Sequence, residues 1–227
     1  MELTVECNSG LVATQELWDE LVIGLQVDDP AAIEGAIRYL EADLWEFRSG
    51  YLKGRLLHHL ANRQLDEHQR RRLRPVLLRY CDVGARFEFA KACRLARRVP
   101  IPGLRDGLIK GLHGGIAATD VRCLRMLFAM KHPRLTERDR AQARRALVQW
   151  AGQVRSNGWD ARWVAPTTKR LWPIDPVGHL TVIAGSGDET ERRGARLLLR
   201  AVRRSERQSS RHGNSAMPSQ SPPPTTG

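Results

Sequence analysis

The sequence predicts an all-α protein, an α-α superhelix (a solenoid of stacked helical hairpins) that ends in a disordered C-terminal tail. Three observations support this prediction. Apolar residues recur at helical spacing through most of the chain, Gly and Pro interrupt these stretches about every 15–20 residues, and one short stretch of sequence recurs further along.

The clearest element is a helical hairpin over residues 29–60. Its first helix carries one apolar stripe, formed by Ile33, Ile37, Leu40, Leu44 and Phe47. Asp29 is placed to cap this helix, and Pro30 suits its first turn because a backbone N–H has no helical partner there. Ser49 and Gly50 mark the corner, and the second helix carries Leu52, Leu56 and Leu60. Two amphipathic helices leave apolar faces uncovered, so this hairpin needs neighbours.

Further helices follow the same plan. We expect them from Thr14, from Asp66, around Phe89–Val99, from Pro102, from Thr119, and from Thr136 to about Val154. Capping boxes are expected at Asp66 with Gln69, at Thr136 with Asp139, and at Ser186 with Glu189 before the last helix. Pro75 is expected to kink its helix or to restart it.

The short repeat strengthens this interpretation. The stretch Gly50-Tyr51-Leu52-Lys53-Gly54 recurs as Gly107-Leu108-Ile109-Lys110-Gly111, and the preceding helices carry Arg38-Tyr39-Leu40 and Arg94-Leu95-Ala96. In this organisation residues 14–154 and 175–205 resemble HEAT-like and armadillo-type α-helical repeats, which implies a solenoid that presents a long binding surface. A compact bundle of unrelated helices is the alternative.

The predicted domain organisation follows from these patterns. We expect a lead-in over residues 1–12, a helical-repeat domain over 13–154, a Trp-containing connection with C-terminal capping helices over 155–205, and a tail over 206–227. The tail is rich in Ser, Pro and Thr and cannot bury an apolar face, so we expect it to be disordered.

Composition limits the class of protein. The chain has 227 residues, 41% of them hydrophobic, and a net charge of +12. No apolar run reaches the roughly 18 residues that a membrane span needs, and the N-terminus lacks an apolar signal core, so a cytoplasmic location is expected. Cys7, Cys81, Cys93 and Cys123 form no CxxC pair, and His58 and His59 are adjacent, so no metal site or cofactor is expected.

The excess of arginine is the main functional signal. Basic residues concentrate in three groups, and the candidate partner-binding residues are Arg70, Arg71, Arg74, Arg144, Arg145, Arg196, Arg200 and Arg203. Such groups contact phosphates or acidic protein surfaces, although ordinary solvated helix faces look the same in sequence.

These observations favour a noncatalytic repeat protein that binds a protein partner with an acidic surface. The alternative is a nucleic-acid-binding protein that uses its Arg-rich faces. The resemblance implies one special case, a DNA glycosylase, for which Trp159, Asp160 and Trp163 are the local candidates. Tryptophans in this region are more often packed than used for base stacking. No catalytic residue is assigned, and the oligomeric state is left open.

Overall fold

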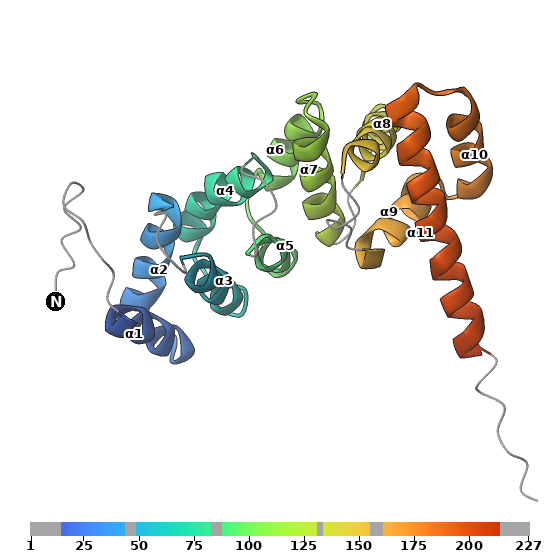
Figure 1. Cartoon of the computed structure of the whole chain (residues 1–227). Coiled ribbons are helices and arrows are strands. Elements are labelled where there is room, and N and C mark those ends of the chain that lie inside the picture. The colour runs from blue at the N-terminus through green and yellow to red at the C-terminus, as the bar shows by residue number, and fades with distance from the viewer. Residues whose placement is uncertain (1–14, 44–48, 83–87, 131–133, 155–160, 214–227) are drawn as a thin grey trace, which may run out of the picture. The chain divides into compact units, whose positions relative to one another are not determined.

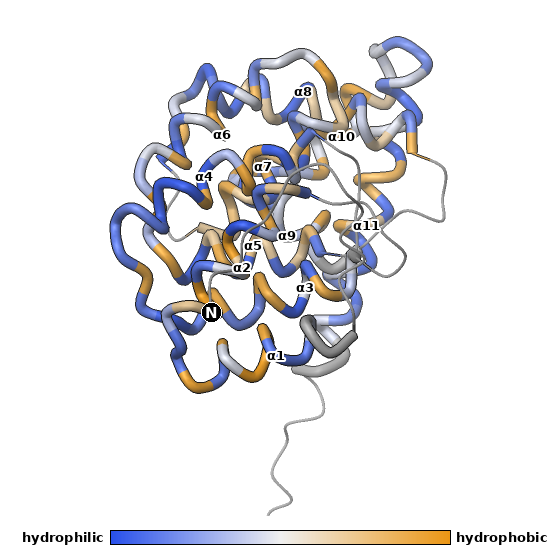
Figure 2. The backbone as a smooth tube through the Cα atoms, turned by 90° about the vertical axis from the view of Figure 1, so that its left-hand side faces the viewer, coloured by the Kyte–Doolittle hydropathy of each residue, from blue (hydrophilic) through white to orange (hydrophobic). Residues whose placement is uncertain are grey.

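The computed structural model describes residues 15–43, 49–82, 88–130, 134–154 and 161–213, and in these residues the protein is all-helical (Figure 1). This part of the chain contains eleven α-helices and no strand, which confirms the predicted all-α class there. Figure 2 shows hydrophobic and hydrophilic residues interspersed along the helices, as expected when each helix buries one of its faces and exposes the other. The predicted lead-in, residues 1–12, lies outside the described residues.

The chain forms two compact units. Unit 1 contains Met1–Gly114 and Arg122–Arg134, and unit 2 contains Gly115–Val121 and Leu135–Gly227. The predicted repeat domain, residues 13–154, therefore includes the described helices of unit 1 and extends into unit 2.

Unit 1 is built from two rows of helices. Its helices are α1 (Gln15–Gln26), α2 (Pro30–Ala42), α3 (Ser49–Leu60), α4 (Glu67–Asp82), α5 (Phe89–Arg98), α6 (Leu104–Leu112) and the second part of α7 (Ala117–Ala129). Helix α3 contacts α1 and α5, while α4 contacts α2 and α6. Helices α1, α2, α3 and α4 thus each pack on the next helix but one in sequence. Leucines such as Leu56, Leu73 and Leu104 are fully buried.

Local signals in unit 1 match the sequence well. The Asp29 side chain accepts a hydrogen bond from the Ala31 amide, with Pro30 in the first turn of α2. The capping box at Asp66 is present, because the Gln69 amide donates to Asp66 Oδ1 at 2.8 Å. Pro75 lies inside α4, which continues through it and does not restart. The predicted stripe residues Leu44 and Phe47 lie outside the described residues.

Unit 2 is organised around one helix. It contains α8 (Glu137–Gln153), α9 (Ala161–Leu171), α10 (Pro176–Ser186), α11 (Glu189–Gly213) and the first part of α7. Helix α11 contacts α8, α9 and α10. Helix α11 therefore contacts every other described helix that lies wholly in unit 2, whereas no described helix of unit 1 contacts all the others of that unit.

Two expectations about α11 need correction. Its capping box is formed by Asp188 and Glu191, not by Ser186 and Glu189. The Glu191 amide donates to Asp188 Oδ1 at 2.8 Å, and the Asp188 amide donates to Glu191 Oε2 at 3.2 Å. Ser186 is instead the last residue of α10. Helix α11 then continues to Gly213, so residues 206–213 are helical where the sequence predicted a disordered tail. The remaining residues, 214–227, are outside the described part.

Candidate interaction surface

The arginines of α11 share one side of the helix. We define the arginine face as Arg192, Arg193, Arg196, Arg200, Arg203, Arg204 and Arg207, all of which are exposed. With 3.6 residues per turn and a 1.5 Å rise, these positions occupy roughly a third of the circumference over about 22 Å. Ala195, Leu198 and Val202 fall on another side and are fully buried. The 3.6-residue period therefore separates the core-facing side of α11 from the arginine face.

The arginine face is electrostatically uncompensated. Among the described residues, none of its seven guanidinium groups forms an ion pair or a hydrogen bond. The nearby carboxylate of Glu206 instead pairs with Lys169 of α9 at 3.5 Å. Arginines four residues apart on a helix repel one another by a few tenths of a kcal/mol. Seven positive charges are thus held together without an internal counter-charge, an arrangement that favours binding of an anionic partner.

Two glycines hold α11 close to α8. A Cβ at Gly194 would overlap the Val148 carbonyl oxygen of α8, and a Cβ at Gly152 would overlap the Thr190 carbonyl oxygen of α11. The two backbones therefore touch where these glycines meet. This crossing fixes the position of α11 and, with it, the direction in which the arginine face points.

The other predicted binding arginines have different surroundings. On α4, Arg71 pairs with Glu67 in the next turn, and the Arg70 Nε donates to the Asp66 carbonyl at 3.2 Å. Arg74 is exposed and its guanidinium lies against Gly103. These residues belong to unit 1, whereas Arg196, Arg200 and Arg203 belong to unit 2.

On α8, the two predicted arginines contribute to the structure of unit 2. Arg144 donates to the Leu171 carbonyl at 2.8 Å, pairs with Glu137 at 2.8 Å, and lies 6.0 Å from the ring of Trp172. Arg145 is exposed and donates to Gln142 at 3.0 Å. Arg144 is therefore less available to a partner than the arginines of α11.

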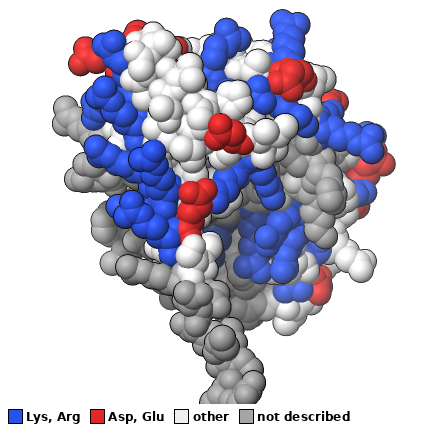
Figure 3. Space-filling view, turned by 90° about the vertical axis from the view of Figure 1, so that its right-hand side faces the viewer, with Lys and Arg blue, Asp and Glu red and all other residues white. Residues whose placement is uncertain are grey.

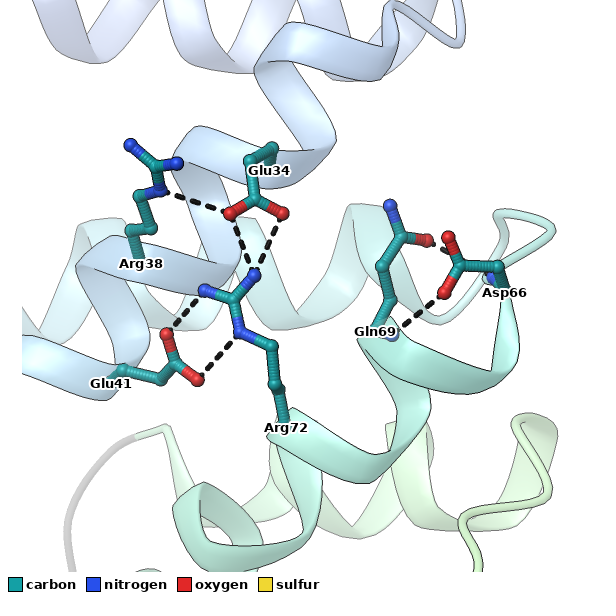
Figure 4. Close-up of polar contacts among 6 residues, drawn as sticks. All are labelled: Glu34, Arg38, Glu41, Asp66, Gln69 and Arg72. Carbon is teal, nitrogen blue, oxygen red and sulfur yellow. Dashed lines mark hydrogen bonds and ion pairs between the residues drawn. The ribbon is translucent and has the colours of Figure 1, made fainter.

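Arg72 shows what a fully paired arginine looks like in this protein. Its guanidinium on α4 lies between two carboxylates of α2 (Figure 4), with N···O distances of 2.6 Å to Glu34 and 2.5 Å to Glu41. Its hydrogen bonds with Glu41 and Glu34 raise the pKa of Arg72. The hydrogen bond from Arg72 in turn lowers the pKa of Glu34. Arg72 thus binds α4 to α2.

Helix α10 adds an exposed apolar surface beside α11. Val182 on α10 is 66% exposed and Ile174 just before it is 83% exposed, while Leu180 is buried. Figure 3 views the side of the molecule on which Figure 1 shows α10 and α11, and an uncharged area there borders one covered by Lys and Arg side chains. This surface was not predicted from the sequence, because the apolar residues of α10 do not form a single stripe.

The described tryptophans of unit 2 are packed. Trp163 lies 5.4 Å from Trp150, and Trp172 is 5% exposed. This agrees with packing in preference to base stacking for these residues. Trp159 and Asp160, the local candidates for a glycosylase site, lie outside the described residues.

Three cysteines are reduced and buried in unit 1. Cys123 and burial raise the pKa of Cys81, and burial raises the pKa of Cys93 to about 12, so both thiols are poor nucleophiles. The described part of the chain contains no group of three or more His, Cys, Asp or Glu side chains arranged to hold a metal ion. Cys7 is outside that part. None of the described helices is long and apolar enough to cross a membrane.

Comparison with known proteins adds no relative: no protein-family model, curated protein or solved structure matches this chain.

Proposed function

We propose that the protein is a noncatalytic interaction protein of the cytoplasm that binds an acidic surface of a protein partner through α10 and α11. The observation that carries this proposal is the arginine face, whose seven exposed guanidinium groups have no carboxylate partner among the described residues. Acidic groups of a partner would supply the missing counter-charge and would remove the repulsion between neighbouring arginines.

The exposed apolar residues on and just before α10, the helix that packs on α11, favour a protein as the partner. Protein interfaces combine a small apolar centre with arginine and a polar rim. Val182 offers apolar contact area on α10, which packs against α11, and Ile174 offers more just before α10 begins. A phosphate backbone would make no use of these two side chains.

We further propose that unit 1 is an α-solenoid of the HEAT-like type. Its support is that α1, α2, α3 and α4 each pack on the next helix but one, as expected for successive hairpins stacked side by side. In such a stack every repeat is held by its neighbours, which gives a firm scaffold for binding surfaces. For unit 2 we propose a different plan, that of a helix cluster, and its support is that α11 contacts α8, α9 and α10.

Nucleic acid is the second candidate partner. The arginine face itself contains no apolar residue, extends over about 22 Å, and consists of the residue type that forms forked hydrogen bonds with phosphate. Binding of this kind weakens steeply with salt, because each neutralised phosphate releases a counterion.

The two partner classes can be separated with one set of variants. Arg196→Glu/Arg200→Glu reverses charge on the arginine face, and Val182→Asp disrupts the apolar surface of α10. The matched control, Arg97→Glu/Arg138→Glu, makes the same charge change at exposed arginines elsewhere. Each protein is used to capture partners from a nuclease-treated lysate of its source, and each is titrated with a fluorescent 20-nucleotide DNA duplex.

We expect a protein that is retained by the native chain and the control but lost with both Arg196→Glu/Arg200→Glu and Val182→Asp. Duplex binding that needs the arginines but not Val182, with no captured protein showing the double dependence, would replace the protein proposal with nucleic-acid binding. Equal behaviour of all variants in both assays would refute both.

A further inference from the structure

A second group of basic side chains lies on unit 1, between α3 and α5. We define the α3–α5 cluster as His58, Lys91, Arg94 and Arg98. The three residues of α5 are spaced by three and four positions and therefore share one side of that helix, which packs on α3. Burial, followed by the positive charges of Arg94, Lys91 and Arg98, lowers the pKa of His58. The four groups are thus close enough to affect one another.

Two polar atoms of the cluster have no partner among the described residues. The Nδ1 of His58 and the Nε of Arg94 are both buried, and neither has a hydrogen bond within that part of the chain. Buried polar groups in proteins are nearly always paired, and leaving one unpaired is unfavourable. The Arg94 Nε–H is always a donor, and the His58 Nδ1 is a donor in one of the two tautomers of the neutral ring, the charge state that the lowered pKa of His58 favours. In that tautomer both nitrogens lack an acceptor, and an anion would supply it.

The surrounding acidic groups are engaged elsewhere. Asp19 of α1 pairs with Arg55 at 3.6 Å, and Asp28 pairs with Arg63 at 3.0 Å. The carboxylate of Glu88 lies against Gly50 at the start of α3. No described carboxylate is paired with Lys91 or Arg94, and Arg98 contacts the neutral amide of Asn62. The cluster is therefore an uncompensated positive site.

We propose that the α3–α5 cluster binds a phosphate group, held between His58 of α3 and Arg94 of α5 with Lys91 and Arg98 beside it. A phosphate oxygen accepts hydrogen bonds from the two unpaired nitrogens, and its negative charge offsets the mutual repulsion of the four basic groups. The ligand class is a free phosphate or the monoester of a small phosphorylated molecule, because these carry a compact, highly charged group. The site is independent of the arginine face and of the function proposed for it.

The test uses the full chain with labelled histidine, and NMR follows its imidazole signals. The protein is titrated separately with inorganic phosphate, with adenosine monophosphate and with a ten-nucleotide thymidine oligomer. The His58 signal is assigned with His58→Gln. We expect a saturable shift of that signal with phosphate or with the monoester, and about a tenfold or greater rise in the half-saturation concentration for Arg94→Gln. Circular dichroism checks that Arg94→Gln is folded, and Lys91→Gln takes its place if it is not.

Arg97→Gln is the matched control, since Arg97 is exposed on the same helix and is also unpaired. Less than a twofold effect from this control supports a defined site, and an effect equal to that of Arg94→Gln overturns it in favour of diffuse charge attraction. A His58 signal that does not saturate with phosphate or monoester, or that shifts only with the oligomer, also overturns the proposal. Arg196→Glu/Arg200→Glu should leave the titration unchanged, so the result is independent of the partner proposed for α11.

Discussion

Arg72 of unit 1 and the arginine face of unit 2 differ in how their charges are compensated. In unit 1, Arg72 is enclosed by two carboxylates of a neighbouring helix and is 21% exposed. In unit 2, the residues of the arginine face of α11 are all exposed and have no carboxylate partner among the described residues. Each of these arginines adds the same single positive charge to the net charge of +12 as Arg72 does, yet only the arginine face can accept a new anionic partner without first losing an internal one.

This difference shows that charge pairing, and not charge density, identifies a candidate surface. In the sequence, the stretch around Arg72 looks as basic as α11. Within five positions of Arg72 there are four more basic residues: His68, Arg70, Arg71 and Arg74. In the fold, several side chains of this stretch, including Arg72, contact one or two of the acidic residues Glu34, Glu41, Asp66 and Glu67.

The first prediction concerns the crossing that holds the arginine face in place. Gly194→Ala should destabilise unit 2 by more than about 3 kcal/mol, because the new Cβ overlaps a backbone oxygen of α8 that cannot move alone. Hydrogen exchange of the α8 and α11 amides measures the loss helix by helix. Gly185→Ala is the control, since a Cβ there meets nothing within 4 Å, and its effect should stay within about 1 kcal/mol. Similar exchange in the two variants would show that the backbone contact is unimportant.

The second prediction concerns the paired side of the comparison. Arg72→Met keeps the length of the side chain but leaves Glu34 and Glu41 close together without a cation. Because the ion pairs are partly exposed and screened, we expect a loss of about 1–3 kcal/mol in unit 1. Urea unfolding combined with hydrogen exchange of α2 and α4 measures it. A loss below about 0.5 kcal/mol would mean that Arg72 is no more structural than a surface arginine.

The pH dependence of unit 1 provides a third test. The pKa of Glu34 is lowered from its ordinary value of 4.5, chiefly by the hydrogen bond from Arg72. A lowered pKa in the folded state means that this contribution to stability is complete above the unfolded value and is lost as the pH falls through the folded value. Unit 1 should therefore lose stability between about pH 5 and pH 2, and Arg72→Met should lose less over the same range. Urea titrations at several pH values measure both slopes, and parallel slopes would assign the acid sensitivity to other carboxylates.

Local sequence signals predicted much of the helix pattern. The caps at Asp29, Asp66 and Thr136 are present because each depends on residues within one turn. The cap of α11 was misplaced because Ser186 with Glu189 and Asp188 with Glu191 have the same spacing. Gly187 is extended, with φ −71° and ψ 173°, so the chain leaves α10 there and Asp188 becomes the cap. The helix then reaches Gly213 because residues 206–212 contain neither Gly nor Pro to stop it.

The candidate site could be predicted only in part. The arginines of α11 were identified from their density, and the period of 3.6 residues explains why they share one side. Which arginines are paired could not be predicted, because Arg72 lies 38 residues from Glu34 and 31 from Glu41. The contact of Gly194 with α8 also joins distant parts of the chain and has no local pattern. The His58 and Arg94 cluster escaped notice for the same reason, since its members come from two helices.

The smallest expected effect on stability is at the centre of the arginine face. Arg200 has no ion partner among the described residues and lies four residues from both Arg196 and Arg204, so Arg200→Gln removes repulsion and breaks no ion pair described in the structure. The free energy of unfolding of unit 2 should change by less than about 0.5 kcal/mol, and we expect a small gain at low salt. Urea unfolding at low and high salt measures this change, and any gain should shrink as salt screens the charges. A loss above 1 kcal/mol would show that Arg200 stabilises the fold, and the contrast with Arg72 would then no longer hold.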